Sequence, residues 1–242
     1  MKPPMQTRSR PGTNPGTQLV IFDCDGTLVD SQHNITAAMA YAFTAHGLVP
    51  PAIPEILSVV GLSLPESFRV LAGGHPIATQ RTLAEHYRDA FVSGNLERRE
   101  DEPLYPAIKS TIAALAARPH VRLGVATGKS KRGVARLFDR EEWHGHFHTI
   151  QTADDHPSKP HPSMIAKAMA EAGAGPAQTV MIGDTSYDME MARNAGVGAI
   201  GVAWGYHAAE RLTRAGAHTV IDDGLLLLAA IDRQLGAQES GR

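Results

Sequence analysis

The feature that most constrains the fold of this chain is an apolar run at residues 19–22 that leads directly into Asp23 and Asp25. A short, continuous apolar run is typical of a strand buried on both faces of a parallel sheet. Two unpaired carboxylates beside a dry interior repel each other and are costly to desolvate. In open α/β sheets, ligands bind at the carboxyl ends of the strands, where these acids fall. The pattern favours a divalent metal at this point over a solvated turn with two surface acids.

The rest of the chain alternates between strand and helix patterns. Apolar runs recur at 121–126, 180–182 and 199–203, with shorter strand candidates at 149–152 and 219–221. Helical patterns separate them: one begins near Pro106, and glycines end two others at Gly173 and Gly196. This alternation predicts an α/β fold with a doubly wound, parallel, Rossmann-like sheet.

One region breaks this alternation. Residues 31–103 show helix after helix without a convincing strand, which predicts an inserted α-helical cap domain above the acids. Within it, Ser63 and Glu66 have the spacing of a capping box. The core domain is then expected at residues 18–30 and 104–242. Residues 1–17 hold Pro, Gly, Thr and Arg without an apolar core, and we expect a disordered tail there.

Composition narrows the class of protein. A chain of 242 residues with 43% apolar residues is long enough for a full α/β core and an insertion. Its net charge of -2 gives no sign of nucleic-acid binding, and its longest late apolar run, 225–231, is too short to span a membrane. The single cysteine, Cys24, excludes an intramolecular disulfide and is interpreted as a small buried filler. We expect a cytoplasmic protein that binds neither nucleic acid nor membranes.

Three further polar clusters follow predicted strands. Thr127 and Gly128 lie where a strand ends and a helix begins, a place suited to phosphate oxygens, although such hydroxyls are also ordinary helix caps. Lys159 would by default be a surface lysine, but it lies on a turn flanked by prolines, which restrict the backbone and could fix the direction of its side chain. Asp184 and Asp188 follow another buried strand, four residues apart at a helix start, so both can point at one centre, although one of them could instead be a helix cap.

Together these clusters resemble the haloacid dehalogenase superfamily over residues 18–222. Residues 23–27, Asp-Cys-Asp-Gly-Thr, match its first signature, and Thr127, Lys159 and the segment from Gly183 to Asp188 match its later motifs in order. The helical insertion is similar to the C1 cap of that superfamily. Within it, the chain is most similar to the phosphoglycolate phosphatase-like group.

The resemblance implies an enzyme that hydrolyses a phosphate ester. Asp23 would be the nucleophile that forms an aspartyl-phosphate, and Asp25 would be the general acid and base. Mg²⁺ would be held by Asp23, Asp184 and the backbone carbonyl of Asp25, with Asp188 orienting that shell. The phosphoryl oxygens would be bound by Thr127 and Lys159 and by nearby backbone N–H groups, for which Gly26 and Gly128 are candidates.

Alternative activities fit the residues less well. Dehalogenases lack an acid at the position of Asp25, and phosphonatases use a cap lysine, whereas residues 31–100 contain none. A phosphohexomutase would need a cap-linker histidine, and His33 is two residues early for that role. A catalytically silent binding or regulatory module stays the least favoured alternative, because all the motif residues are present.

The substrate is expected to be a small phosphorylated metabolite. The loop of residues 60–64 is the candidate roof, in which Gly61, Leu62 and Ser63 would contact substrate, with Arg69 one or two turns further on. A tight roof favours 2-phosphoglycolate, while a sugar phosphate, a nucleotide or pyrophosphate stays open. The protein would act as a monomer or a homodimer.

Two groups of residues are given structural interpretations. The alternating His144, His146 and His148, with His156 and His161 close behind, could ligate zinc, but no cysteine or acid completes an obvious set, so they are interpreted as surface or loop residues. The scattered Trp143, Trp204 and Tyr206 are interpreted as packing residues.

Overall fold

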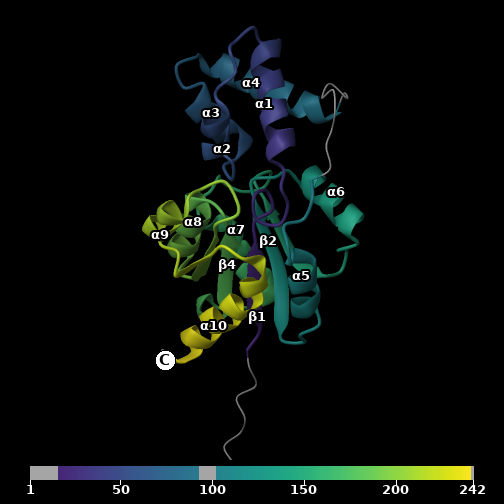
Figure 1. Cartoon of the computed structure of the whole chain (residues 1–242), viewed down its shortest axis with the longest axis vertical. Helices are drawn as coiled ribbons and strands as arrows, with labels where there is room; N and C mark the ends of the chain where they lie inside the picture. Colours follow the sequence, from purple (N-terminus) through teal and green to yellow (C-terminus); the bar gives the residue numbers. More distant parts are fainter. Residues whose placement is uncertain (1–15, 93–101, 241–242) are drawn as a thin grey trace, which may run out of the picture.

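The computed structural model describes residues 16–92 and 102–240 of the chain (Figure 1). Its centre is a six-stranded parallel sheet with the strand order β3-β2-β1-β4-β5-β6. The strands, in chain order, are β1 (Gln18–Phe22), β2 (Val121–Thr127), β3 (Phe147–Thr152), β4 (Thr179–Gly183), β5 (Gly198–Val202) and β6 (Thr219–Ile221). Every run that the sequence marks as a strand is therefore a strand, and the predicted doubly wound parallel sheet is confirmed.

Helices cover both faces of this sheet. One face is covered by α5 (Ile108–Ala116), α6 (Lys131–Glu141) and α10 (Leu227–Ser240). The other is covered by α7 (Ser163–Ala172), α8 (Ser186–Ala195) and α9 (Ala209–Ala215), and 3-10 turns lie at Pro176–Gln178 and Gly224–Leu226. Alternate residues of β1 face the two layers: Val20 and Phe22 pack into the first, Leu19 and Ile21 into the second. Because a strand has a period of two, an apolar run without alternation is what this double burial requires.

Of the helices that the described residues form between β1 and β2, all but α5 stand above the sheet at one end (Figure 1). They are α1 (Gln32–Ala45), α2 (Ile53–Ser58), α3 (Leu64–Leu71) and α4 (Ile77–Val92). They enclose a core of their own, to which α1 contributes Ile35, Met39 and Phe43, α3 contributes Phe68 and α4 contributes Leu83. The ring centroids of Phe43 and Phe68 lie 6.0 Å apart in this core. A separate apolar core is what a helical insertion needs to hold its shape, because the sheet is already covered by other helices.

The predicted capping box at the start of α3 differs from the structure, and two predicted segments lie largely outside the described residues. Ser63 is the N-cap of α3, but its side chain makes no capping hydrogen bond, and Glu66 pairs with Arg69 at 2.6 Å, so the predicted capping box is wrong. A capping box is instead found at the start of α8, between Thr185 and Asp188. Most of the predicted disordered tail, residues 1–17, and the final part of the predicted cap, residues 93–101, lie outside the described residues.

Candidate active site

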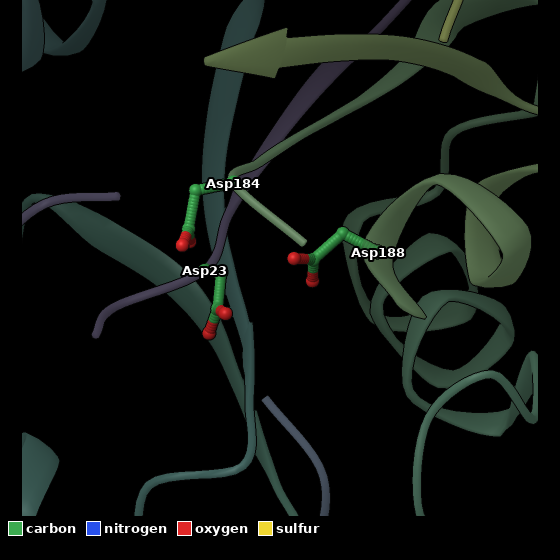
Figure 2. Close-up of side chains that lie close together, drawn as sticks. All are labelled: Asp23, Asp184 and Asp188. Carbon is green, nitrogen blue, oxygen red and sulfur yellow. The ribbon is translucent and has the colours of Figure 1, made fainter. Parts of the chain in front are cut away.

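Three aspartates meet at the carboxyl ends of β1 and β4 (Figure 2). Asp23 follows β1, Asp184 follows β4, and Asp188 lies in the first turn of α8; each can offer a carboxylate oxygen within 4.8 Å of the other two. All three are buried. β1 and β4 are hydrogen-bonded neighbours, so residues 161 positions apart are brought together by one strand pairing.

Lys159 holds two of these carboxylates. Its Nζ lies 2.9 Å from Oδ2 of Asp23 and 2.6 Å from Oδ1 of Asp188, and its side chain has no exposed area. Burial alone would lower the pKa of Lys159, but the carboxylates of Asp188 and Asp23 outweigh burial and raise it. Lys159 is therefore a charged ammonium buried among acids.

The charges of the cluster do not balance. The cluster has three carboxylates, and Lys159, the one ammonium described beside it, contacts two of them. Burial raises the pKa of Asp23 from its usual 3.8 to about 6, helped by Asp188 and opposed by Lys159. Burial, together with Asp188 and Asp23, also holds the pKa of Asp184 well above its usual range. Oδ2 of Asp23 is buried without a well-aligned hydrogen bond in the described part of the chain, although Lys159 is close. An excess of buried carboxylate oxygens, one of them without a well-aligned hydrogen bond, fits a hard divalent cation.

The remaining carboxylate oxygens are held by neighbouring groups. Asp184 accepts hydrogen bonds from Thr27 Oγ1 at 2.7 Å and from the backbone N–H of Tyr206 at 2.9 Å. Oδ2 of Asp188 accepts from Thr185 Oγ1 at 2.6 Å and from the Thr185 backbone N–H at 3.1 Å. Oδ1 of Asp188 contacts Lys159, so both carboxylate oxygens of Asp188 already have partners. This arrangement suits a residue that holds its neighbours in place.

A pocket of about 540 Å³ opens between the sheet and the helices above it. From the sheet it is lined by Asp23, Asp25, Thr127 and Gly128, and from the loop between α2 and α3 by Gly61, Leu62 and Ser63. Gly26 does not line this pocket. It lies against the aspartate cluster, because a side chain at this position would overlap the Asp184 carboxylate. Arg69 does not line this pocket; it pairs with Glu66 instead.

Several residues at the site carry no obvious signal in the sequence. Lys129 bonds Asp25 at 2.6 Å, and Glu102 in turn bonds Lys129 at 3.2 Å. Tyr206, interpreted from sequence as packing, does pack against the upper helices, but its backbone also binds Asp184. Of these, Lys129 could have been suspected from its place two residues after Thr127; Glu102 and Tyr206 could not, because only the tertiary structure brings them here.

The histidines at 144–148 do not form a shared site. His144 and His146 lie in a turn and only His148 is in β3, so they are not aligned along one extended strand. His144 contacts Asp139 at 2.6 Å, and His148 contacts the backbone carbonyl of Glu171 at 3.0 Å. Among the described residues, Asp23, Asp184 and Asp188 are the one group of three or more that could hold a metal.

The fold and the site together define a hydrolase built on a doubly wound sheet with carboxylates at its strand ends. Residues 20–202 match the family model described as haloacid dehalogenase-like hydrolase, so the chain belongs to that family. The family resemblance seen in the motifs is thereby confirmed.

Named relatives lie within the same family. A "Probable phosphatase IndB" of Dickeya dadantii is 34% identical over 209 residues, which span 84% of this chain and 89% of that protein. A phosphoglycolate phosphatase of Pseudomonas putida is 32% identical over 221 residues, spanning 90% and 80% of the two chains. The crystal structure of a "predicted phosphatase" from Clostridium acetobutylicum, 25% identical, superposes with a TM-score of 0.79 over 90% of this chain and 99% of that one. Within the described residues, no helix is long and apolar enough to cross a membrane.

Proposed function

We propose that this protein is a Mg²⁺-dependent phosphatase that hydrolyses a small phosphomonoester through an aspartyl-phosphate on Asp23. The observation that carries the proposal is the position of Asp23: it lines the pocket, lies 2.9 Å from the buried Lys159, and belongs to the aspartate cluster. The names of the relatives support the same reaction class.

In the first step, a carboxylate oxygen of Asp23 attacks phosphorus and the bond to the ester oxygen breaks. Asp25, two residues further on and also lining the pocket, gives its proton to the leaving oxygen. In the second step, Asp25 takes a proton from water, which attacks phosphorus and releases phosphate and the free Asp23 carboxylate. Lys159, Thr127 and backbone N–H groups would bind the phosphoryl oxygens.

The metal would be held by Asp23, Asp184 and the backbone carbonyl of Asp25, with Asp188 fixed behind them. Bound Mg²⁺ would offset the repulsion between an anionic nucleophile and a phosphate dianion, about 4 kcal/mol for each pair of unit charges 4 Å apart at an effective dielectric near 20. Mg²⁺ is favoured over larger cations because the three protein oxygens leave room for water and substrate oxygens in an octahedral shell.

Among substrates we favour 2-phosphoglycolate. The four helices above the sheet would act as the cap domain, and three arginines line the pocket, Arg88 from α4 and Arg132 and Arg136 from α6. Their charge suits a leaving group that is itself anionic, such as a carboxylate. The pocket is also large enough for a sugar phosphate. A screen of the purified protein against phosphorylated metabolites would decide between these substrates.

The test of the reaction is phosphate release with Mg²⁺ together with mass spectrometry of rapidly quenched protein. We expect phosphate bound covalently to Asp23 in the native protein, and neither the adduct nor turnover in Asp23→Asn, because an amide is a poor nucleophile. The exposed Asp139→Asn is the matched control and should behave as wild type. Retained turnover in Asp23→Asn would refute the mechanism; a rearranged sugar phosphate instead of free phosphate would identify a mutase; no turnover of any phosphomonoester would favour a binding role.

A further inference from the structure

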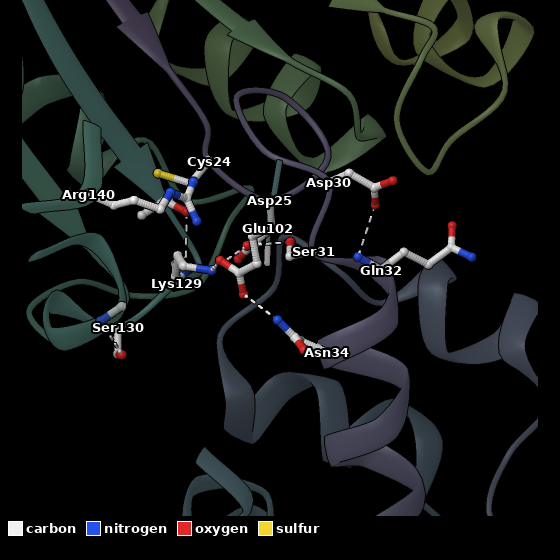
Figure 3. A network of polar contacts seen from close by, with 12 residues as sticks. Cys24, Asp25, Asp30, Ser31, Gln32, Asn34, Glu102, Lys129, Ser130 and Arg140 are labelled. Carbon is white, nitrogen blue, oxygen red and sulfur yellow. Dashed lines mark hydrogen bonds and ion pairs between the residues drawn. The ribbon is translucent and has the colours of Figure 1, made fainter. Parts of the chain in front are cut away.

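The carboxylate of Asp25 lies in a hydrogen-bond network outside the aspartate cluster (Figure 3). Its Oδ1 accepts from Ser31 Oγ and from Lys129 Nζ, each at 2.6 Å. Lys129 Nζ also bonds Oε2 of Glu102 at 3.2 Å, and the other Glu102 oxygen accepts from Asn34 Nδ2 at 3.3 Å. We call these five residues, Asp25, Ser31, Asn34, Glu102 and Lys129, the Asp25 network.

The charged members of the network are nearly enclosed. The exposed fractions of the side chains are 13% for Asp25, 12% for Lys129 and 10% for Glu102. Burial would by itself lower the pKa of Lys129, but the two carboxylates outweigh burial and raise it, so the ammonium stays charged. A lysine held at this depth between two acids is not the solvated lysine expected near a helix start.

The network joins parts of the chain that are otherwise separate. Lys129 belongs to the loop between β2 and α6, where its backbone N–H bonds Thr127 Oγ1 at 3.1 Å. Ser31 and Glu102 belong to the two segments that connect the sheet to the helices above it. These segments are hydrogen-bonded to each other, from the Asp30 N–H to the Pro103 carbonyl at 2.9 Å and from the Tyr105 N–H to the Leu28 carbonyl at 3.0 Å. Glu102 is therefore held in place by backbone pairing, and it can in turn hold Lys129.

We propose that Lys129, held by Glu102, is a positioning residue that fixes the Asp25 carboxylate for proton transfer; the proposal rests on the proposed phosphatase function. Ser31 and Lys129 both donate hydrogen bonds to Oδ1 of Asp25, so Oδ2 is the oxygen that carries the proton. This proton moves from Oδ2 to the leaving oxygen as the phosphorus–oxygen bond breaks. Rotation of the carboxylate would take that proton out of line, and small misplacements of reacting groups cost about 10²-fold in rate. Lys129 thus acts through Asp25, and its contribution depends on how much the leaving group needs a proton.

The experiment compares two probes that differ by one methylene group, 4-nitrophenyl phosphate and 4-nitrobenzyl phosphate. The first has a good phenolate leaving group, while the second releases an alkoxide that needs a proton. The measured quantity is kcat/KM, which covers the steps up to leaving-group release and excludes hydrolysis of the aspartyl-phosphate. We expect Lys129→Met to lower kcat/KM at least ~10-fold more for the benzyl than for the phenyl ester, because general acid catalysis contributes roughly 10²–10⁴-fold.

Two further variants complete the design. Lys131→Met removes a lysine two residues away, 58% exposed and paired with Asp155, and should leave the ratio of the two kcat/KM values unchanged. Glu102→Gln keeps the shape of Glu102 but weakens its hold on Lys129, so the benzyl ester should again lose more, by about 3-fold or more. If Lys129→Met does not fold, Glu102→Gln decides the outcome.

The outcomes are separable. A selective loss on the benzyl ester supports the proposal. Equal losses on both esters overturn it, because a structural or phosphate-binding lysine would affect both alike; an unchanged ratio in both variants of an active protein also overturns it. If the wild-type protein hydrolyses neither ester nor any other phosphomonoester, the proposed function itself fails, and this result is distinct from a failure of Lys129 as a positioning residue.

Discussion

The ammonium of Lys159 is enclosed by the carboxylates of Asp23 and Asp188, and its side chain has no contact with solvent. An ion in this position is costly to desolvate, so each charge depends on the others for compensation. At the scale of the residue, catalysis and stability would therefore act through the same atoms in the proposed reaction. Lys159 would bind a phosphoryl oxygen during turnover and, between turnovers, would be the counter-ion of the nucleophile Asp23.

Replacement of this lysine should show that dependence. We expect Lys159→Met to abolish phosphatase activity and to lower the free energy of unfolding of the metal-free protein by about 3–5 kcal/mol, since it leaves buried carboxylates uncompensated. Urea unfolding with and without Mg²⁺ measures the effect, and added Mg²⁺ should restore part of the loss. The exposed Lys167→Met is the control. A loss below about 1 kcal/mol for Lys159→Met would show that the carboxylates are neutralised by protonation instead.

A buried histidine gives a second test at this scale. Nδ1 of His207 accepts from the Ser186 N–H at 2.9 Å, and its Nε2 contacts the Ser58 carbonyl at 3.2 Å, an arrangement that suits a neutral ring with its proton on Nε2. Burial, helped by Arg211 and opposed by the Ser58 carbonyl, lowers the pKa of His207 from 6.5 to about 4. The unfolded chain therefore binds a proton at this residue between pH 6.5 and 4 that the folded chain does not bind.

The free energy of unfolding should consequently fall as pH drops from about 6.5 to about 4, and this one residue should account for up to roughly 3 kcal/mol of the fall. Chemical denaturation at a series of pH values measures the slope. His207→Gln should flatten the slope in this window, because it removes the group that titrates only after unfolding. Identical slopes for the two proteins would contradict the assignment.

At the scale of elements, the loop between α2 and α3 rests on the loops at the carboxyl end of the sheet. The Ser63 N–H bonds Ser158 Oγ at 2.8 Å. At the end of α2, just before this loop, the Ser58 carbonyl accepts a hydrogen bond from Tyr187 Oη of α8 at 3.0 Å. Gly128 lies so close that a Cβ there would be 2.6 Å from the Leu62 carbonyl oxygen. This glycine allows two backbones to approach each other directly over the pocket, which is a close approach that no other residue permits.

Gly128→Ala should therefore push the α2–α3 loop away from the sheet, because neither backbone can yield cheaply. We expect kcat/KM for the preferred phosphomonoester to fall by roughly 10-fold or more, with the aspartate cluster still intact, since a misplaced pocket wall costs about 10²-fold per ångström. Steady-state kinetics of the wild type and Gly128→Ala measures this change in kcat/KM. Gly74→Ala is the matched control, because a Cβ at Gly74 meets nothing within 4 Å. An unchanged kcat/KM in Gly128→Ala would mean that the loop does not shape the site.

At the scale of the whole molecule, the site is assembled where two layers of helices, one sheet and the helices above them meet. The carboxyl ends of β1, β2 and β4 all point to this edge (Figure 1), so Asp23, Thr127 and Asp184 converge although the sequence separates them widely. A cation bound by Asp23 and Asp184 would bridge β1 and β4, the central pair of the sheet. Metal binding should therefore raise the free energy of unfolding of the entire chain.

We expect Mg²⁺ to raise the thermal unfolding midpoint, because a ligand at 100 times its Kd adds about 2.7 kcal/mol to the free energy of unfolding. Differential scanning fluorimetry across a Mg²⁺ titration measures the shift, and Asp184→Asn should abolish it. Excess chelator should stop turnover. Ca²⁺ should raise the midpoint but inhibit turnover, because a larger ion takes more ligands and can occupy both oxygens of the nucleophile. A midpoint that does not respond to Mg²⁺ would contradict the metal assignment.

The sequence by itself determined the strands, the order of the motifs and the helical insertion, because each depends on local patterns. A doubly buried strand such as 19–22 has no polar alternation, and a run such as 180–184 ends in an acid at a known position relative to its strand. The meeting of Asp23 with Asp184 was implied by the family resemblance, and in the structure the pairing of β1 with β4 produces it.

The tertiary structure decided which side chains support those residues. Ser31 and Ser63 both look like helix caps, yet Ser31 turns its hydroxyl to Asp25 and the Ser63 side chain caps nothing. Glu102 reaches Lys129 only because the two connecting segments pair with each other. The physical reason is that a hydroxyl or a carboxylate has several partners of similar energy, and the choice among them depends on which groups the folded chain brings within 3 Å.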